Sequence, residues 1–409
     1  MDKSCFFSAK CIFIALSIVS NIVSNTVVFA DQLSDAQLMP VSAAGNNPVI
    51  TPTAPPVNAK AYILIDVDSG KIIAEKNSNV KLPPASLTKM MTLYVISNAL
   101  KHEQLHLNDS VRISQEAWKI GGSRMFVKQG EHVPVQDLLK GIIVDSGNDA
   151  CVAMAEHLGS SELGFTQLMN HQAQQLGMLN SHFTDSTGLP NPDHYTTAKD
   201  LAILGRALIT HFPEYYGWYK QKWFTYNGIR QPNRNRLLWR DSFVDGIKTG
   251  HTNDAGFCLV SSAKRDGMRL LAVVLNEPTD TSRADDSERL LNYGFRFFET
   301  HPLYRAGQSI ITLPLYKGTK PTLNIGVLEP QSITLPSGQY QRLSIKVRSP
   351  KYLESPITKG QAIGELLLQF DNETVNTLKL YALEDAPKGG IFKRIKDSIR
   401  LTCKRWFNA

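Results

Sequence analysis

Paired cysteines, metal-binding motifs and phosphate-binding loops are all missing from this chain of 409 residues. Its 5 cysteines have neither the spacing of a disulfide framework nor that of a zinc site. The 10 histidines are scattered, and none pairs with a glutamate at the helical spacing of a catalytic metal site. We therefore expect a function that needs no metal and no cofactor.

A hydrophobic run of membrane-spanning length is also lacking. Lys3 and Lys10 precede a short apolar stretch at 12–19, and a possible cleavage site follows at 28–30. This order is typical of a secretory signal peptide, and Asn21 interrupts the stretch before it reaches the length of a membrane span. We predict that residues 1–30 are a signal peptide and that the chain is exported. An uncleaved N-terminal anchor is the alternative.

Negative charge is in deficit, and the formal net charge is +7, with the basic excess concentrated in residues 388–409. On a helix this segment places apolar side chains on one face and basic ones around the rest: Ile391, Phe392, Ile395, Ile399, Thr402, Cys403 and Trp406 against Lys393, Arg394, Lys396, Arg400, Lys404 and Arg405. Such a helix suits an anionic membrane interface. The alternative is a terminal helix packed on its own domain. A nucleic-acid tail leaves Trp406 unexplained, so we expect no nucleic-acid partner.

Between these ends the sequence pattern predicts two folded domains. Residues 31–58 are rich in Pro, Ala, Asn and Thr and indicate a linker. Residues 59–301 begin and end with strand-like runs, at 62–67, 71–76, 257–263 and 268–275, and helical patterns fill the middle before a last helix at 287–300. This order predicts an α+β domain, in which helices flank an antiparallel sheet built from both ends of the segment. Short strands with Gly and Pro turns at 304–386 predict a small all-β domain.

The first candidate for chemistry is the pair Ser86 and Lys89. Ser86 follows two prolines at the expected first turn of a helix, so a lysine three residues later shares its face. Burial and nearby positive charge would both lower the pKa of Lys89 and leave a neutral amine available as a base. Ser261 and Lys264 have the same spacing, but they lie in a predicted strand, where such residues point to opposite faces. We therefore interpret Ser261 as structural.

Two further clusters follow in order along the chain. Ser146 and Asn148 lie between two helical stretches, where the simple alternative is a polar turn with a helix cap. Lys248, Thr249 and Gly250 lie on a predicted edge strand, where an extended substrate can pair with the backbone. The three clusters together supply a hydroxyl nucleophile, bases and an amide, which is the equipment of an acyl-transfer enzyme.

With this motif set, the chain resembles the serine D-alanyl-D-alanine carboxypeptidases, which are low-molecular-mass penicillin-binding proteins. The stretches 122–126 and 245–252 are similar to that family, and the resemblance covers nearly the whole chain. It implies a catalytic domain with the β-lactamase and penicillin-binding-protein transpeptidase fold, a small all-β domain and a membrane-anchoring C-terminal helix at 388–409. It also implies peptidoglycan stem peptides as substrates and β-lactam antibiotics as ligands.

The resemblance further implies a role for each candidate residue. Ser86, activated by Lys89, would attack the peptide bond between two terminal D-alanines, and water would hydrolyse the acyl-enzyme. Backbone N–H groups of Ser86 and His251 would hold the oxyanion. The remaining roles would be proton transfer and electrostatics for Ser146 and Lys248, substrate contacts for Asn148, Thr249 and Gly250, and carboxylate binding for Arg234 and Arg283. The expected location is the periplasmic face of the bacterial inner membrane.

Three rival functions stay open on the sequence. A β-lactamase would need a glutamate to activate the deacylating water, and Glu162 lacks the asparagine four residues later that this pattern requires. A D-Ala endopeptidase that cleaves cross-links would use the same chemistry. A non-catalytic penicillin-binding scaffold would not need the intact motif residues Lys89 and Lys248.

Overall fold

The computed structural model describes residues 33–34, 38–39 and 51–407. The predicted signal peptide, 1–30, lies outside the described residues. The described chain divides into two compact units, which are discontinuous in sequence. The larger unit comprises 51–308 and 327–344, and the smaller one comprises 33–34, 38–39, 309–326 and 345–407.

An antiparallel sheet of five strands forms the centre of the larger unit, in the order β4-β3-β11-β10-β9. Its strands are β3 (Ala61–Asp66), β4 (Ile72–Lys76), β9 (Val244–Thr252), β10 (Gly256–Arg265) and β11 (Met268–Glu277). The pairing of β3 with β11, in which Leu64 lies opposite Ala272, joins the start of the unit to its end. The sheet is thus built from both ends of the segment, as the sequence pattern predicts.

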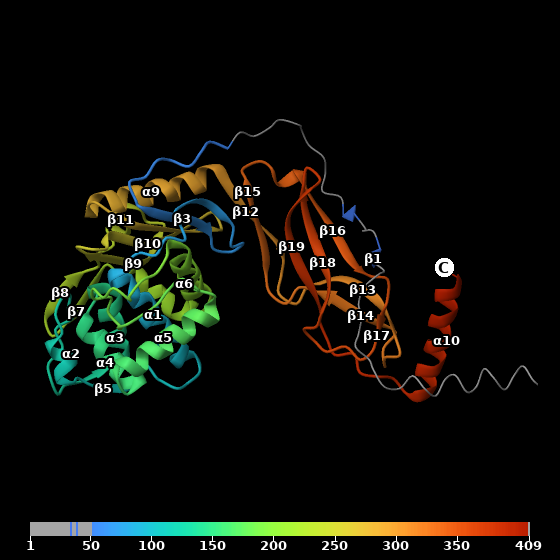
Figure 1. Ribbon diagram of the computed structural model, residues 1–409, viewed down its shortest axis with the longest axis horizontal. Helices are drawn as coiled ribbons and strands as arrows, with labels where there is room; N and C mark the ends of the chain where they lie inside the picture. The colour runs from blue at the N-terminus through green and yellow to red at the C-terminus, as the bar shows by residue number, and fades with distance from the viewer. Residues whose placement is uncertain (1–32, 35–37, 40–50, 408–409) are drawn as a thin grey trace, which may run out of the picture. The chain divides into compact units, whose positions relative to one another are not determined.

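Successive side chains along each strand point to opposite faces of the sheet, and apolar side chains on both faces explain why both are covered. Ile63 and Ile65 belong to one buried cluster, which the helices of the middle segment complete. Tyr62 and Leu64 point to the other face and join a second cluster with the helix α9 (Asp280–Phe297). Figure 1 shows α9 along one side of the sheet and α1 (Lys89–Lys101) and α6 (Ala198–His211) on the other. The fold therefore has a layer of helices on each face of the sheet.

The other elements of the larger unit surround this framework. The helices are α2 (Gln115–Lys119), α3 (Val135–Lys140), α4 (Asn148–Gly159), α5 (Glu162–Leu176), α7 (Pro213–Tyr216) and α8 (Leu237–Arg240), with the 3₁₀ helices η1 (Ala85–Thr88) and η3 (Gly217–Lys220) and the π-helix η2 (Gly141–Asp145). Three strand pairs complete it: β5 (Ser110–Arg112) with β6 (His132–Pro134), β7 (Trp223–Tyr226) with β8 (Ile229–Pro232), and β12 (Phe298–Tyr304) with β15 (Gln331–Pro336).

The last helix of the larger unit differs in its bounds from the predicted 287–300. It begins at Asp280 because Thr279 caps it: the Thr279 hydroxyl accepts the Ser282 N–H at 2.9 Å, and Ser282 returns the contact. It ends at Phe297, and the chain then continues as β12. A serine in place of the usual glutamate hides this capping box from a sequence search.

The smaller unit is a β-sheet domain followed by one helix, α10 (Ile391–Phe407). Its strands are β1 (Leu33–Ser34), β2 (Leu38–Met39), β13 (Ser309–Tyr316), β14 (Thr322–Gly326), β16 (Leu343–Pro350), β17 (Leu353–Glu354), β18 (Ala362–Phe370) and β19 (Glu373–Ala382). They form one sheet in the order β1-β16-β18-β19-β14-β13-β17, with β2 paired to β16. The α+β architecture, the β-rich domain and the C-terminal helix are thus confirmed.

Candidate active site

Ser86 and Lys89 meet where η1 runs into α1. The turn of η1 starts directly after Pro83 and Pro84, and it places Ser86 one turn before the lysine. The Nζ atom of Lys89 lies 2.9 Å from Oγ of Ser86. Lys89 has no solvent exposure at all, whereas Ser86 lines an open cleft. A buried amine therefore contacts a hydroxyl that a substrate can reach.

The surroundings of Lys89 favour its neutral form. Burial is the largest cause and lowers its pKa from the ordinary value of a lysine, and the positive charge of Arg234 acts in the same direction. Cys151 and Asp185 oppose the shift without reversing it. Nζ also donates to the carbonyl oxygen of Thr187 at 2.7 Å. A neutral lysine amine in this position can accept the proton of the Ser86 hydroxyl.

Ser146 and Asn148 lie where the π-helix η2 is followed by the α-helix α4. The π-helix η2 ends at Asp145. The next residue, Ser146, adopts left-handed backbone angles (φ 60°, ψ 35°), and α4 begins two residues later. A non-glycine residue in this region is strained, and such strain is common at functional sites. The Asn148 side chain donates to the carbonyl of Gly121 at 2.6 Å, and its backbone N–H donates to the carbonyl of Ser123 at 2.7 Å. These contacts fix the turn that carries Ser146 toward the cleft.

The third cluster lies on β9, the edge strand of the sheet, which leaves one side of its backbone unpaired by other strands. A side chain on Gly250 would place its Cβ 2.8 Å from the carbonyl oxygen of Pro84, so this glycine lets the strand approach η1 closely. Lys248 is buried, and its pKa is well below the ordinary value, first because of burial and then because of the charge of Lys89. Its Nζ donates to the carbonyl of Thr249 at 3.0 Å.

The three clusters open onto one cleft of roughly 590 Å³. Ser86, Ser146 and Thr249 line it together with Arg234 and Arg283, whereas Lys89 and Lys248 lie buried behind it. The cleft lining also includes Ser123, Pro232, Asn233, Arg236, Trp239, Gly250, His251, Phe257 and Asp280. The structure therefore brings together side chains from η1, the turn before α4, and β9.

The two predicted carboxylate-binding arginines have different settings. Arg283 is largely buried, donates to the carbonyl of Gly250 at 3.1 Å and forms an ion pair with Asp280. Arg234 is exposed on the loop that follows β8. His251 is also exposed, and its ring stacks on Phe257 with 4.0 Å between centroids. The guanidinium-bearing residues Arg234, Arg236 and Arg283 thus line the same cleft as Ser86.

With this geometry in place, comparison with known proteins decides the family. Residues 48–279 match the model of the D-alanyl-D-alanine carboxypeptidase family (Peptidase_S11). Residues 298–388 match the C-terminal domain of penicillin-binding protein 5. The chain belongs to the D-alanyl-D-alanine carboxypeptidase family. The predicted fold, family and enzyme class are thereby confirmed, in favour of a carboxypeptidase over the rival β-lactamase.

Similar proteins of this carboxypeptidase family include D-alanyl-D-alanine carboxypeptidase DacC of Escherichia coli, which is 44% identical over 368 residues covering 88% of this chain and 92% of the relative. The crystal structure of penicillin-binding protein 5 from Haemophilus influenzae has a TM-score of 0.77 and 40% identity, over 82% of this chain and 99% of that one. Penicillin-binding protein D2 from Listeria monocytogenes in its ampicillin-bound form has a TM-score of 0.55 and 28% identity, over 60% of this chain and 100% of that one.

Glu162, the residue weighed as a β-lactamase base, has a structural contact instead. Its Oε1 accepts the Ser186 N–H at 3.1 Å and the Ser186 hydroxyl at 2.8 Å, and the residue is not part of the cleft lining. The same loop supplies groups that the sequence motifs do not include, above all the Thr187 carbonyl on Lys89. A backbone carbonyl has no signature in a sequence. Cys151, buried in α4 near both lysines, was likewise outside every motif, and burial raises its pKa to about 12.

Proposed function

We propose that this carboxypeptidase removes the terminal D-alanine of peptidoglycan pentapeptide stems through an acyl-enzyme on Ser86. The observation that carries the proposal is the 2.9 Å contact between the fully buried Lys89 amine and the Ser86 hydroxyl. A base is effective when the proton it removes is within hydrogen-bond reach and its own pKa is tuned toward the working pH. Both conditions are supported at this pair.

In the first step Lys89 takes the Ser86 proton while Oγ attacks the carbonyl carbon between the two D-alanines. Backbone N–H groups of Ser86 and His251 stabilise the resulting oxyanion. When the tetrahedral intermediate collapses, the C–N bond breaks and the leaving amine takes up the proton through Ser146. In the second step water attacks the carbonyl carbon of the ester. Its proton returns through Ser146 and Lys89 to Oγ of Ser86, and the ester C–O bond breaks to free the serine. The buried Lys248 contributes positive potential or a proton beside Ser146.

Substrate orientation follows from the charges of the cleft. A carboxypeptidase must recognise a free C-terminal carboxylate, and Arg234 and Arg283 are the guanidinium groups we assign to it, because both line the cleft with Ser86. Thr249 and Gly250 on the edge strand β9 hold the extended peptide, and the Asn148 amide supports a substrate carbonyl. β-Lactams imitate this peptide and acylate the same serine. The ampicillin-bound form of the Listeria relative supports that assignment.

The decisive experiment measures free D-alanine released from a synthetic pentapeptide. Replacement of the nucleophile, Ser86→Ala, should abolish both D-alanine release and covalent labelling by a fluorescent penicillin. The matched control is Ser261→Ala, which removes a buried hydroxyl with the same spacing to a lysine, 3.4 Å from the Ala272 carbonyl in the middle of the sheet. We expect this control to keep the parent activity. D-alanine release by Ser86→Ala at the parent rate would reject the mechanism.

We also propose that the chain is exported and held at the periplasmic face of the inner membrane by α10. One side of this helix is attached to the β domain: Asp397 accepts the Lys317 N–H at 2.8 Å, Lys404 donates to the Tyr316 hydroxyl at 3.0 Å, and Leu401 is buried. The helix is therefore fixed through the side that carries Asp397, Leu401 and Lys404. Across the described part of the chain, no helix is both long and apolar enough to cross a membrane.

The opposite side of α10 supports a lipid contact. Phe392 is 85% exposed and Trp406 is 86% exposed, and Ile391, Ile395 and Ile399 are exposed between them. Positions 391, 395, 399 and 406 recur at helical spacing, about half a turn away from Asp397 and Leu401. Fixing the opposite side to the β domain leaves this apolar face available for the headgroup region of a bilayer.

Sedimentation with vesicles tests the membrane assignment. The parent should bind vesicles that contain anionic lipid, and the double variant Phe392→Ser, Ile399→Ser should lose binding because it removes apolar area from the exposed face. Leu179→Ser is the matched control, since Leu179 is similarly exposed but lies in the larger unit. Equal binding by the double variant and the parent would refute the role of α10.

A further inference from the structure

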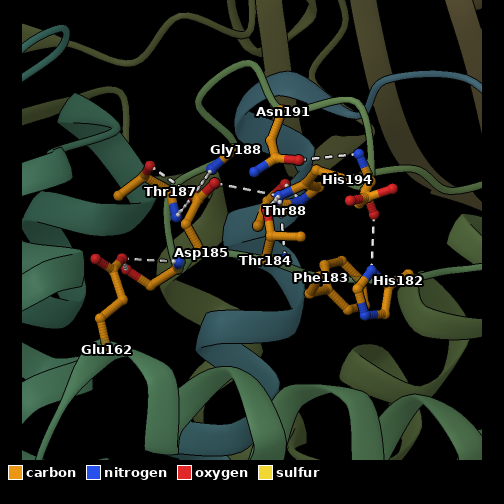
Figure 2. A network of polar contacts seen from close by, with 12 residues as sticks. Thr88, Glu162, His182, Phe183, Thr184, Asp185, Thr187, Gly188, Asn191 and His194 are labelled. Atoms are coloured by element: carbon orange, nitrogen blue, oxygen red, sulfur yellow. Dashed lines mark hydrogen bonds and ion pairs between the residues drawn. The ribbon is translucent and has the colours of Figure 1, made fainter.

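The carboxylate of Asp185 stabilises the loop at 185–188, which contacts Lys89. Oδ1 of Asp185 accepts three hydrogen bonds: from the Thr187 N–H at 2.7 Å, the Thr187 hydroxyl at 2.8 Å and the Gly188 N–H at 2.6 Å (Figure 2). Burial by itself would raise the pKa of Asp185, but these bonds and the contact with His194 hold it below the ordinary value. Asp185 therefore stays ionised and keeps residues 185–188 in one turn.

The second oxygen of Asp185 leads to a buried histidine. Nδ1 of His194 lies 3.2 Å from Oδ2 of Asp185 and 3.1 Å from the Thr184 hydroxyl, and Nε2 lies 2.8 Å from Oγ1 of Thr88. Nδ1 of the ring thus faces the ionised carboxylate of Asp185, and Nε2 and the Thr88 hydroxyl share a hydrogen bond. The order hydroxyl, imidazole, carboxylate is that of a catalytic triad. Thr88 is fully buried, however, and is not part of the cleft lining, so it is not a nucleophile.

This series of contacts, from Thr88 through His194 and Asp185 to Thr187, is connected to Lys89 at both ends. Thr88 immediately precedes Lys89, and the Thr187 carbonyl at the other end accepts its amine at 2.7 Å. The loop also packs tightly on the turn that carries the nucleophile. Gly188 has φ +87°, and a Cβ there would lie 1.8 Å from the carbonyl oxygen of Ala85. No residue with a side chain fits here, so the loop and η1 hold each other in a fixed position.

We infer that Asp185, His194 and Thr88 act as a positioning relay, which fixes the Thr187 carbonyl and so aims the Lys89 amine at Ser86. A neutral amine has two N–H groups and one lone pair. If one N–H is held by the Thr187 carbonyl, the amine can turn its lone pair toward the Ser86 hydroxyl only in a restricted range of angles. A misplacement of about 1 Å in such a constellation costs about 100-fold in rate. The inference rests on the proposed role of Lys89 as base.

Asp185 has a second effect, which separates it from its two partners. Its negative charge raises the pKa of Lys89 against the dominant influence of burial. The other ionisable groups that act on Lys89 are Cys151, Asp149, Arg234 and Lys248. Removing the charge in Asp185→Asn should therefore move the acid limb of the pH profile to lower pH. The variants His194→Gln and Thr88→Val leave that charge in place and should slow the reaction without a comparable shift of the limb.

The test measures penicillin acylation and D-alanine release against pH for Asp185→Asn, His194→Gln and Thr88→Val. Rates are expressed per active site, which exhaustive labelling with penicillin counts, so that misfolded protein does not contribute. We expect each variant to lose about 10- to 100-fold in kcat while KM changes little. Thr88→Ser retains the hydroxyl and should restore most of the rate. His182→Gln is the matched control, because His182 is exposed on the same loop and contacts the Asp193 carbonyl rather than Asp185.

A purely structural network would give a different result. Variants that melt at lower temperature but keep the rate per site and the pH profile of the parent would overturn the relay, as would equal rates for Thr88→Val and Thr88→Ser. If Asp185→Asn does not fold, the threonine pair decides the question by itself. A parent enzyme that released no D-alanine would instead reject the proposed function, so the two failures are distinguishable.

Discussion

Two pairs of lysines, one at the active-site cleft and one on the C-terminal helix, have opposite surroundings. Lys89 and Lys248 are buried, and burial is the main cause of their lowered pKa values. Lys396 and Lys404 on α10 are exposed to solvent. Burial, and not residue type, therefore separates a lysine that can exchange protons from one that contributes positive charge to a surface. Four variants test this difference, beginning with the largest expected effect.

Lys89→Arg should nearly abolish acylation. A guanidinium stays protonated and cannot accept the Ser86 proton, and the loss of general-base catalysis costs up to about 10⁴-fold. Stopped-flow acylation by a fluorescent penicillin measures the effect. The same change on the exposed helix, Lys396→Arg, should leave the rate unaltered. Acylation by Lys89→Arg within a few-fold of the parent rate would exclude the lysine as base.

Lys248→Met should slow acylation less, by about 100-fold, because it removes an electrostatic contribution and not the base itself. The same variant should be more stable at neutral pH. The folded-state pKa of Lys248 lies below its unfolded value, so the parent gains stability as pH rises between the two and carries a cost at lower pH. Methionine removes that cost. Thermal melting at pH 7 and pH 10 should show a difference between the proteins that shrinks at the higher pH.

Glu277→Gln extends the comparison to a buried carboxyl. Burial, helped by Asp286, raises the pKa of Glu277 to about 7, and Asp286 in turn accepts the Asn58 N–H at 2.6 Å. An acid whose folded-state pKa is raised loses stability as pH rises from its unfolded value toward about 7, and the loss is constant above that. The amide should therefore stabilise the protein by about 1–2 kcal/mol at pH 8. Denaturant unfolding should show almost no difference near pH 4.5.

The exposed charges of α10 should have the smallest effect. Replacing Lys396 and Arg400 by glutamine should weaken binding to anionic vesicles by about 1 kcal/mol for each residue, and added salt should reduce the difference. D-alanine release in solution should not change, because these side chains are in the smaller unit and the cleft is in the larger one. A loss of catalytic rate in this variant would contradict the division of roles between the two pairs.

The spacing of apolar residues along the sequence predicts most of the fold. The five-stranded sheet follows from β-prone runs at both ends of the catalytic segment, because such runs can bury themselves only against one another. The left-handed turn at Ser146 does not follow from periodicity. It depends on the hydrogen bond from the Asn148 side chain to the Gly121 carbonyl and not on local propensity. The start of α9 also differs from the prediction, because its capping partner is Ser282 and not the usual glutamate.

The motif residues of the site can be predicted from the sequence. The residues that hold them in place cannot. Ser86 and Lys89 are three residues apart, so helical geometry alone brings them together. Thr187 and Lys89 are 98 residues apart, and their contact uses a backbone carbonyl that any residue could supply. The contact of Thr88 with His194 bridges 106 residues. Long-range partners of this kind become visible only when the loop is seen packed on η1.

The most direct test of the account is the pH dependence of Ser86 acylation in the parent enzyme, followed by mass spectrometry of the adduct. We expect one penicilloyl group on the peptide that contains Ser86, formed at a rate that reaches its plateau below the ordinary lysine pKa of about 10.4. An adduct on another residue, or a rate that still climbs through that pH, would contradict a neutral buried Lys89 as the base.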